Sequence, residues 1–162
     1  MTEERIGTSR RAVFMEGVHD GVPIALGYFV VAFTLGILAK TAGLTAWQGF
    51  VTSAVNIASA GEYAGFTVIA ANAPYLEIAV LTLVANARYF LMSAALTQRF
   101  SPETPLLHRL AVSFGVTDEI FGITVARGGM VHPYYNYGAL AISVPAWSAG
   151  TSAGILAGGV LP

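Results

Sequence analysis

Several ionisable residues lie inside stretches that are otherwise apolar. They are Glu62, Arg88 and the adjacent pair Asp118 and Glu119. In a lipid bilayer a lone central Arg or Asp costs about 2.5–3.5 kcal/mol on insertion scales, so such residues face the interior of a helix bundle and pair. We therefore predict that Arg88 pairs with Asp118 or Glu119, which leaves the other carboxylates without a basic partner.

A carboxylate that is buried without a counter-charge favours its protonated form and can exchange protons. Glu62, or one member of the acidic pair, is therefore a candidate for coupling the movement of a solute to a proton, with Arg88 orienting the site. The alternative is a structural ion pair that only holds helices in register.

The spacing of the polar residues limits what they can do together. Asp118 and Glu119 are adjacent, so on a helix their side chains diverge by about 100° and cannot act as a paired acid and base. For the same reason we expect Arg88 to face the interior and Asn86 to bond to a neighbouring helix. Trp147 is expected to pack or lie at the interface, or to wall a solute cavity.

Other kinds of site find little support in the sequence. The chain has no cysteine, and His19, His108 and His132 lie far apart, so we predict no metal site and no cofactor. There is no G-x-S-x-G motif or Ser, His and Asp constellation in usable order, so an enzyme is not expected. The basic residues form no stripe, which argues against nucleic-acid binding.

The composition indicates how these residues are positioned. The chain is 55% hydrophobic and 10% charged, with a mean hydropathy of +0.65, whereas soluble domains average about 25% charged residues. We predict an all-α, polytopic membrane helix bundle forming a single transmembrane domain over residues 1–162. A secretory signal after Arg10 and Arg11 is the competing interpretation, but the apolar run is too long and further apolar segments follow.

The predicted apolar segments can be placed between polar connections. Residues 1–20 form a cytoplasmic N-terminus, with Asp20 capping the first segment, and residues 98–109 form a polar loop. The segments are 21–39, 44–73, 75–97, 110–126 and 138–161.

The second segment is longer than a bilayer requires, and its centre contains Asn56, Ser59, Gly61 and Glu62. We predict two half-helices that meet near 59–62, with one long tilted helix as the alternative. Irregular backbone at membrane depth lines a cavity or is buried in protein, so Ser59, Gly61 and Glu62 are candidate binding residues.

The last segment is rich in small residues. Gly150, Gly154 and Gly158 recur every fourth residue on one helical face, which predicts tight helix packing. The chain then stops at Leu161 and Pro162 without a polar tail, so a C-terminally truncated chain is expected.

Two topologies remain open. If the second segment crosses once, the basic N-terminus and the loop at 99–109 lie on opposite sides. If it is re-entrant, both are cytoplasmic and only Lys40 and Arg127 are outside, which fits the excess of basic residues in cytoplasmic loops. We prefer the re-entrant topology. We also predict that the protein crosses the cell membrane several times.

Blocks of residues in this order resemble the AzlC-like branched-chain amino acid permeases over most of the chain. They are Gly17, Pro23, Gly27 and Tyr28; Ser59-Ala60-Gly61-Glu62-Tyr63; Asn86-Ala87-Arg88; Asp118-Glu119-Ile120-Phe121; and Trp147 followed by Gly150-Thr151.

The resemblance implies an exporter of small hydrophobic amino acids such as valine, working with a small AzlD-like membrane subunit. The site would comprise Ser59, Gly61, Glu62, Asn86, Arg88, Asp118, Glu119 and Trp147. The sequence departs from the family at Glu62, where relatives generally have Gln, which bears on substrate identity, and in its shorter length. A channel or structural membrane subunit without alternating access is the alternative function.

Overall fold

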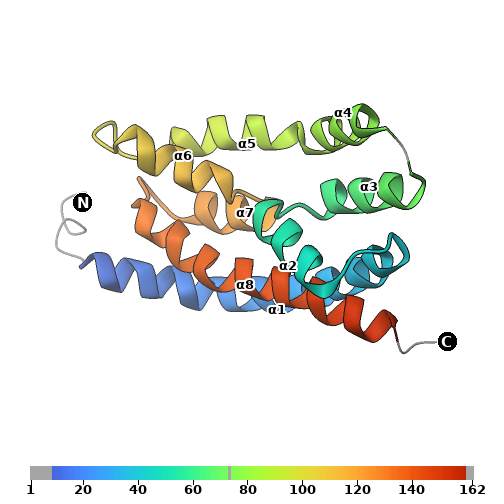
Figure 1. Ribbon diagram of the computed structural model, residues 1–162. Coiled ribbons are helices and arrows are strands. Elements are labelled where there is room, and N and C mark those ends of the chain that lie inside the picture. The colour runs from blue at the N-terminus through green and yellow to red at the C-terminus, as the bar shows by residue number, and fades with distance from the viewer. Residues whose placement is uncertain (1–8, 73, 160–162) are drawn as a thin grey trace.

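The computed structural model describes residues 9–72 and 74–159, which form helices and no strand (Figure 1). The predicted all-α fold is confirmed. The helices are α1 (Arg10–Thr41), α2 (Ala46–Val55), α3 (Ser59–Ala70), α4 (Tyr75–Asn86), α5 (Arg88–Thr97), α6 (Leu106–Phe114), α7 (Asp118–Ala126) and α8 (Pro133–Gly158).

The long helices α1 and α8 run alongside each other through the molecule (Figure 1). Each is long and apolar enough to cross a membrane, and the bent pair α4 and α5 can form a further span. Helix α1 begins much earlier than predicted, because Ser9 is its N-cap and the helix continues through Asp20 and Pro23. The prediction that Asp20 caps the first segment is therefore wrong, since residues 10–20 already belong to the same helix.

Glycines allow α1 and α8 to approach backbone to backbone. A Cβ atom added at Gly150 or Gly154 would overlap the carbonyl oxygen of Phe29 or Phe33 on α1. The predicted packing row therefore contacts α1 at these two positions. At Gly158 the nearest atom would be the Cβ of Lys40, at an ordinary 3.4 Å, so the contact loosens there. Helix α1 contributes its own close contacts at Gly17, Gly21 and Gly36, none of which was predicted to pack against another helix.

The predicted interruption of the second segment is present, and the third segment, predicted as 75–97, is bent as well. The second breaks at residues 56–58, just before the predicted position, because Asn56 ends α2 and α3 begins at Ser59. The third bends by 44° between Asn86 and Arg88.

The fourth segment was predicted as one span over 110–126, and this is wrong. Gly115 ends α6, and the Thr117 side chain accepts a hydrogen bond from the Ile120 backbone N–H as the N-cap of α7. These local stop and start signals divide the segment. Asp118 and Glu119 consequently lie at a helix N-terminus. His108 and Arg109 lie inside α6, not in a loop.

The divided segments fold back on themselves. Helix α2 enters from one end of the bundle and α3 returns to that end, while α6 and α7 do the same from the opposite end (Figure 1). The start of α1 and the 99–105 connection therefore share one end, as the re-entrant topology predicts. Arg127 was predicted to lie at the other end, and this is wrong because α7 also returns. It pairs with Glu16 at 2.5 Å and Asp20 at 3.7 Å near the start of α1.

Arg109 fixes the connection between α5 and α6. Its guanidinium donates to the backbone carbonyls of Thr97 at 2.8 Å, Ser101 at 2.7 Å and Thr104 at 3.1 Å. Thr97 is the last residue of α5, so Arg109 satisfies a carbonyl at a helix C-terminus, where positive charge is also favoured.

We predict that Arg109→Lys lowers the free energy of unfolding by about 2 kcal/mol, because an ammonium cannot reproduce the guanidinium fork. Thermal or denaturant unfolding of purified protein measures this. Arg11→Lys, at an exposed position, is the matched control. Equal stability of the two variants would show that the hydrogen bonds of the Arg109 guanidinium do not contribute to the free energy of unfolding.

Candidate transport site

A cavity of about 100 Å³ lies where the breaks of the divided segments meet. The α2–α3 break contributes Ile57 and Ser59, the α4–α5 bend contributes Arg88 and Tyr89, and the α6–α7 break contributes Thr117, Asp118 and Glu119. Tyr28 and Val31 of α1 and Trp147 of α8 complete the lining. Helix ends that lie far apart in the sequence therefore converge on one small polar space.

The charged residues of the cavity are paired as the sequence predicts. Arg88 Nη1 lies 2.9 Å from Asp118 Oδ2, with side chains 49% and 48% exposed in this chain. Glu119 points elsewhere and accepts a hydrogen bond from the Tyr28 hydroxyl at 2.7 Å. The same hydroxyl contacts Thr117. The two adjacent acids therefore have different partners, and Arg88 remains open to the cavity.

Glu62 does not line the cavity but lies behind Trp147. Its side chain is 1% exposed, and its Oε1 accepts a hydrogen bond from Trp147 Nε1 at 2.7 Å. Its Oε2 has no hydrogen-bond partner among the described residues. Trp147 also meets the Tyr28 ring edge-on, with centroids 5.3 Å apart. Trp147 is thus both a wall of the cavity and the contact that separates it from the buried carboxyl group.

Asn86 joins the two re-entrant halves of the second segment to α4. Its Nδ2 lies 3.5 Å from Asn56 Oδ1, as expected for a bond to a neighbouring helix. A Cβ atom at Gly61 would lie 2.6 Å from Asn86 Nδ2, so only glycine leaves room for this amide. Within residues 9–72 and 74–159, the buried Asn86 Oδ1 atom has no hydrogen-bond partner. Gly61 and Asn86 therefore act on the cavity through the position of the break and not as lining residues.

The helix ends give the cavity a mixed electrostatic character. Helices α3, α5 and α7 begin at Ser59, Arg88 and Asp118, and each of these residues lines the cavity. The N-cap residue of α3, Ala58, supplies no side-chain cap. Free backbone N–H groups and the positive end of a helix dipole favour an anionic group, while Asp118 and Glu119 favour a cation. The site is therefore suited to a small zwitterion.

Some lining residues were not recognised from the sequence as part of a site. Tyr28 entered only through the family resemblance, and Thr117 and Tyr89 did not enter at all. For Thr117 a signal existed, because a threonine directly before two acidic residues is typical of a helix N-terminus. For Tyr89 no signal in the sequence separated it from the other aromatic residues.

Comparison with known proteins identifies a family of membrane proteins. Residues 23–161 match the family model described as AzlC protein. The chain belongs to the AzlC family. An uncharacterized membrane protein of Archaeoglobus fulgidus is 29% identical to this AzlC-family chain over 94% of its length and 66% of the relative. Inner membrane protein YgaZ of Escherichia coli is 32% identical over 72% of the chain and 47% of the relative.

The chain thus spans about two thirds and about half the length of these curated relatives. No solved structure matches it significantly. The relatives and the apolar helices establish a membrane protein of the AzlC family.

Proposed function

We propose that this AzlC-family protein is a secondary transporter that exports branched-chain or similar small hydrophobic amino acids. It would act as the large subunit of a two-component permease, with a small AzlD-like membrane subunit as its partner. The observation that carries the proposal is the convergence of the helix breaks on a cavity that contains Arg88, Asp118 and Glu119. Substrate sites of secondary transporters are typically formed by discontinuous helices in this way.

Each part of an amino acid has a complementary group in the cavity. The carboxylate would be held by Arg88 and the uncapped N-terminus of α3, and the ammonium by Asp118 or Glu119. The aliphatic side chain would contact Val31, Ile57 and Trp147. A cavity of about 100 Å³ is well below the roughly 300 Å³ of pockets for drug-sized ligands, which favours a small solute.

The basic residues support an orientation in the cell membrane. Arg10, Arg11, Arg99, Arg109 and Arg127 all lie towards the end of the bundle where α1 starts, whereas Lys40 lies at the other end. Cytoplasmic loops carry the excess of Lys and Arg. We therefore place the start of α1 in the cytoplasm, so that export runs from this end towards Lys40.

Reconstitution tests the proposal. The chain, co-produced with its small membrane partner, would be placed in proteoliposomes, and release of radiolabelled valine measured against unlabelled valine outside. A transporter gives saturable release that is accelerated by the outside substrate. Flux that rises linearly with concentration would instead indicate a channel, and no flux above empty liposomes would contradict both functions.

Glu62 is the candidate for proton coupling, because its carboxyl group is buried beside the cavity and no cation pairs with it among the described residues. Burying a charge without a partner is costly, so the protonated form is favoured there. We predict that Glu62→Gln makes the valine flux independent of an imposed pH gradient.

The measurement is the valine flux of Glu62→Gln liposomes with and without the pH gradient. Glu77→Gln, which removes an exposed carboxylate from the first turn of α4, is the matched control and keeps the gradient dependence. A Glu62→Gln protein that still responds fully to the gradient would assign coupling to another group.

A further inference from the structure

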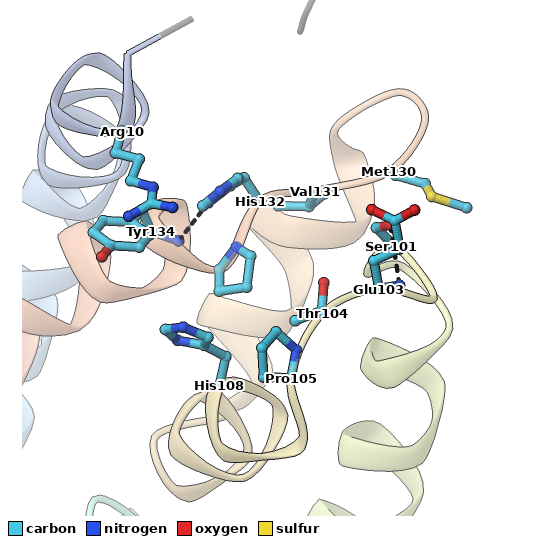
Figure 2. A pocket seen from close by; sticks show the side chains of 11 residues that line it. Arg10, Ser101, Glu103, Thr104, Pro105, His108, Met130, Val131, His132 and Tyr134 are labelled. Atoms are coloured by element: carbon cyan, nitrogen blue, oxygen red, sulfur yellow. Dashed lines mark hydrogen bonds between the residues drawn. The ribbon is translucent and has the colours of Figure 1, made fainter.

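A second cavity, of about 490 Å³, lies at the end of the bundle where α1 begins (Figure 2). It is lined by the start of α1, the connection between α5 and α6, the first turn of α6, and the connection between α7 and α8. None of its lining residues belongs to the transport site. It is therefore a separate candidate binding site.

The lining of this cavity includes three basic side chains and one acidic one. Arg10, His108 and His132 face it from α1, α6 and the residue before α8, and Glu103 is the acidic residue of the lining. Arg10 lies over the ring of Tyr134, 5.7 Å from its centroid, and Figure 2 shows its guanidinium beside His132. This contact holds the guanidinium at the rim of the cavity.

The two helix ends at the cavity are not equivalent. The side chain of His132 accepts a hydrogen bond from the Tyr134 backbone N–H and so caps α8. Pro105 is the N-cap of α6 and supplies no side-chain cap. The positive end of the α6 dipole therefore adds to the charge of Arg10. Partial desolvation, followed by the charges of Arg10 and His108, lowers the pKa of His132, which is consistent with a positive field here.

The surroundings of the cavity match the edge of a bilayer. Tyr134 and Tyr137 lie close together, with ring centroids 5.6 Å apart, and tyrosines concentrate at membrane interfaces. Met130, which lines the cavity, is 64% exposed, and Leu106 and Leu107, which lie in sequence between the lining residues Pro105 and His108, are also exposed. Exposed apolar side chains thus lie next to a cavity with basic side chains, which is the combination that a phospholipid with an anionic headgroup requires.

We propose that this cavity binds a phosphate group, supplied by the headgroup of an anionic phospholipid whose acyl chains cover Met130, Leu106 and Leu107. Basic pockets between membrane helices bind such headgroups. Arg10 and the N-terminus of α6 would hold the phosphate, with His108 and His132 as further donors. Inorganic phosphate is the other source of the same chemistry, and the experiment separates the two.

The test is native mass spectrometry of the purified full chain titrated with phosphatidylglycerol, phosphatidylcholine or inorganic phosphate. We expect retained phosphatidylglycerol adducts and about fivefold weaker binding in Arg10→Gln, since one basic residue near the surface contributes about that factor. Arg11→Gln removes the same charge one residue away, outside the lining, and is expected to bind as the unaltered protein does.

Glu103→Gln removes the acidic residue of the lining and is expected to strengthen phosphatidylglycerol binding. This is a change that a partly unfolded protein would not show.

Each outcome of the titration decides between the sources. Inorganic phosphate that binds and displaces phosphatidylglycerol, with Arg10→Gln weakening both, would keep the phosphate site but reject the lipid as its specific occupant. Equal binding of phosphatidylcholine, or equal losses in Arg10→Gln and Arg11→Gln, would overturn the proposal.

Discussion

Gly154→Ala is expected to lower the free energy of unfolding by about 1–3 kcal/mol, the usual cost of forcing extra volume into a packed interface. The added Cβ would overlap the carbonyl oxygen of Phe33 and lie 2.9 Å from the Cα of Gly36. Both obstacles are backbone atoms of α1, so no side-chain rotation relieves the overlap. The two long helices must move apart, which loosens the contacts on which the rest of the bundle is built.

Thermal unfolding of the purified protein in detergent measures this loss. Gly158→Ala is the matched control on the same face of α8, because its nearest neighbours would be at 3.4–3.5 Å. Alanine also favours a helix over glycine by up to about 1 kcal/mol, so this variant should be unchanged or slightly more stable. If both variants were equally stable, the close approach of α1 and α8 would not be a source of stability.

Arg88→Gln is expected to reduce valine flux by about 10- to 100-fold while leaving stability nearly unchanged. A hydrogen bond to a charged group contributes about 1.5–3 kcal/mol, which corresponds to that range of binding. The ion pair with Asp118 is half-exposed, and such pairs contribute only about 0–1 kcal/mol to folding. Loss of a residue that binds substrate therefore lowers the valine flux, whereas loss of a residue that only joins helices lowers the free energy of unfolding.

The exchange of charges distinguishes these roles further. Arg88→Asp combined with Asp118→Arg restores an ion pair of reversed polarity, which repairs a purely structural contact but presents the wrong charge to a substrate carboxylate. Flux and unfolding are measured in both single variants and in the double variant. Full recovery of flux in the double variant would contradict the proposed substrate contact and assign the pair a structural role.

Much of the fold follows from local features of the sequence. Apolar segments of sufficient length predict membrane helices, and the polar residues between Asn56 and Glu62 predict that the second segment is interrupted. Arg88 and the acidic pair predict an ion pair, because isolated charges in apolar segments require partners. For the same reason the polar residues, and not the apolar ones, carried most of the information about the site.

The division of the fourth segment was missed although its signals were present. Gly115 and Thr117 are a helix stop and a helix cap, but the apolar residues on either side favoured one continuous span. This error also misplaced Arg127. Because α6 and α7 run in opposite directions, Arg127 lies at the same end of the bundle as the start of α6.

The sequence by itself determined that this chain forms membrane helices with internal breaks and a paired arginine. Only the tertiary structure decided that the breaks meet in one cavity, that Trp147 contacts Glu62 across 85 positions of sequence, and which glycines of α1 receive α8. The physical reason is that the central part of α1 is apolar on all sides, so the sequence marks no packing face on it, and the glycine row of α8 predicts a packing face without saying which helix it meets. The choice of face depends on backbone contacts between residues far apart in the chain.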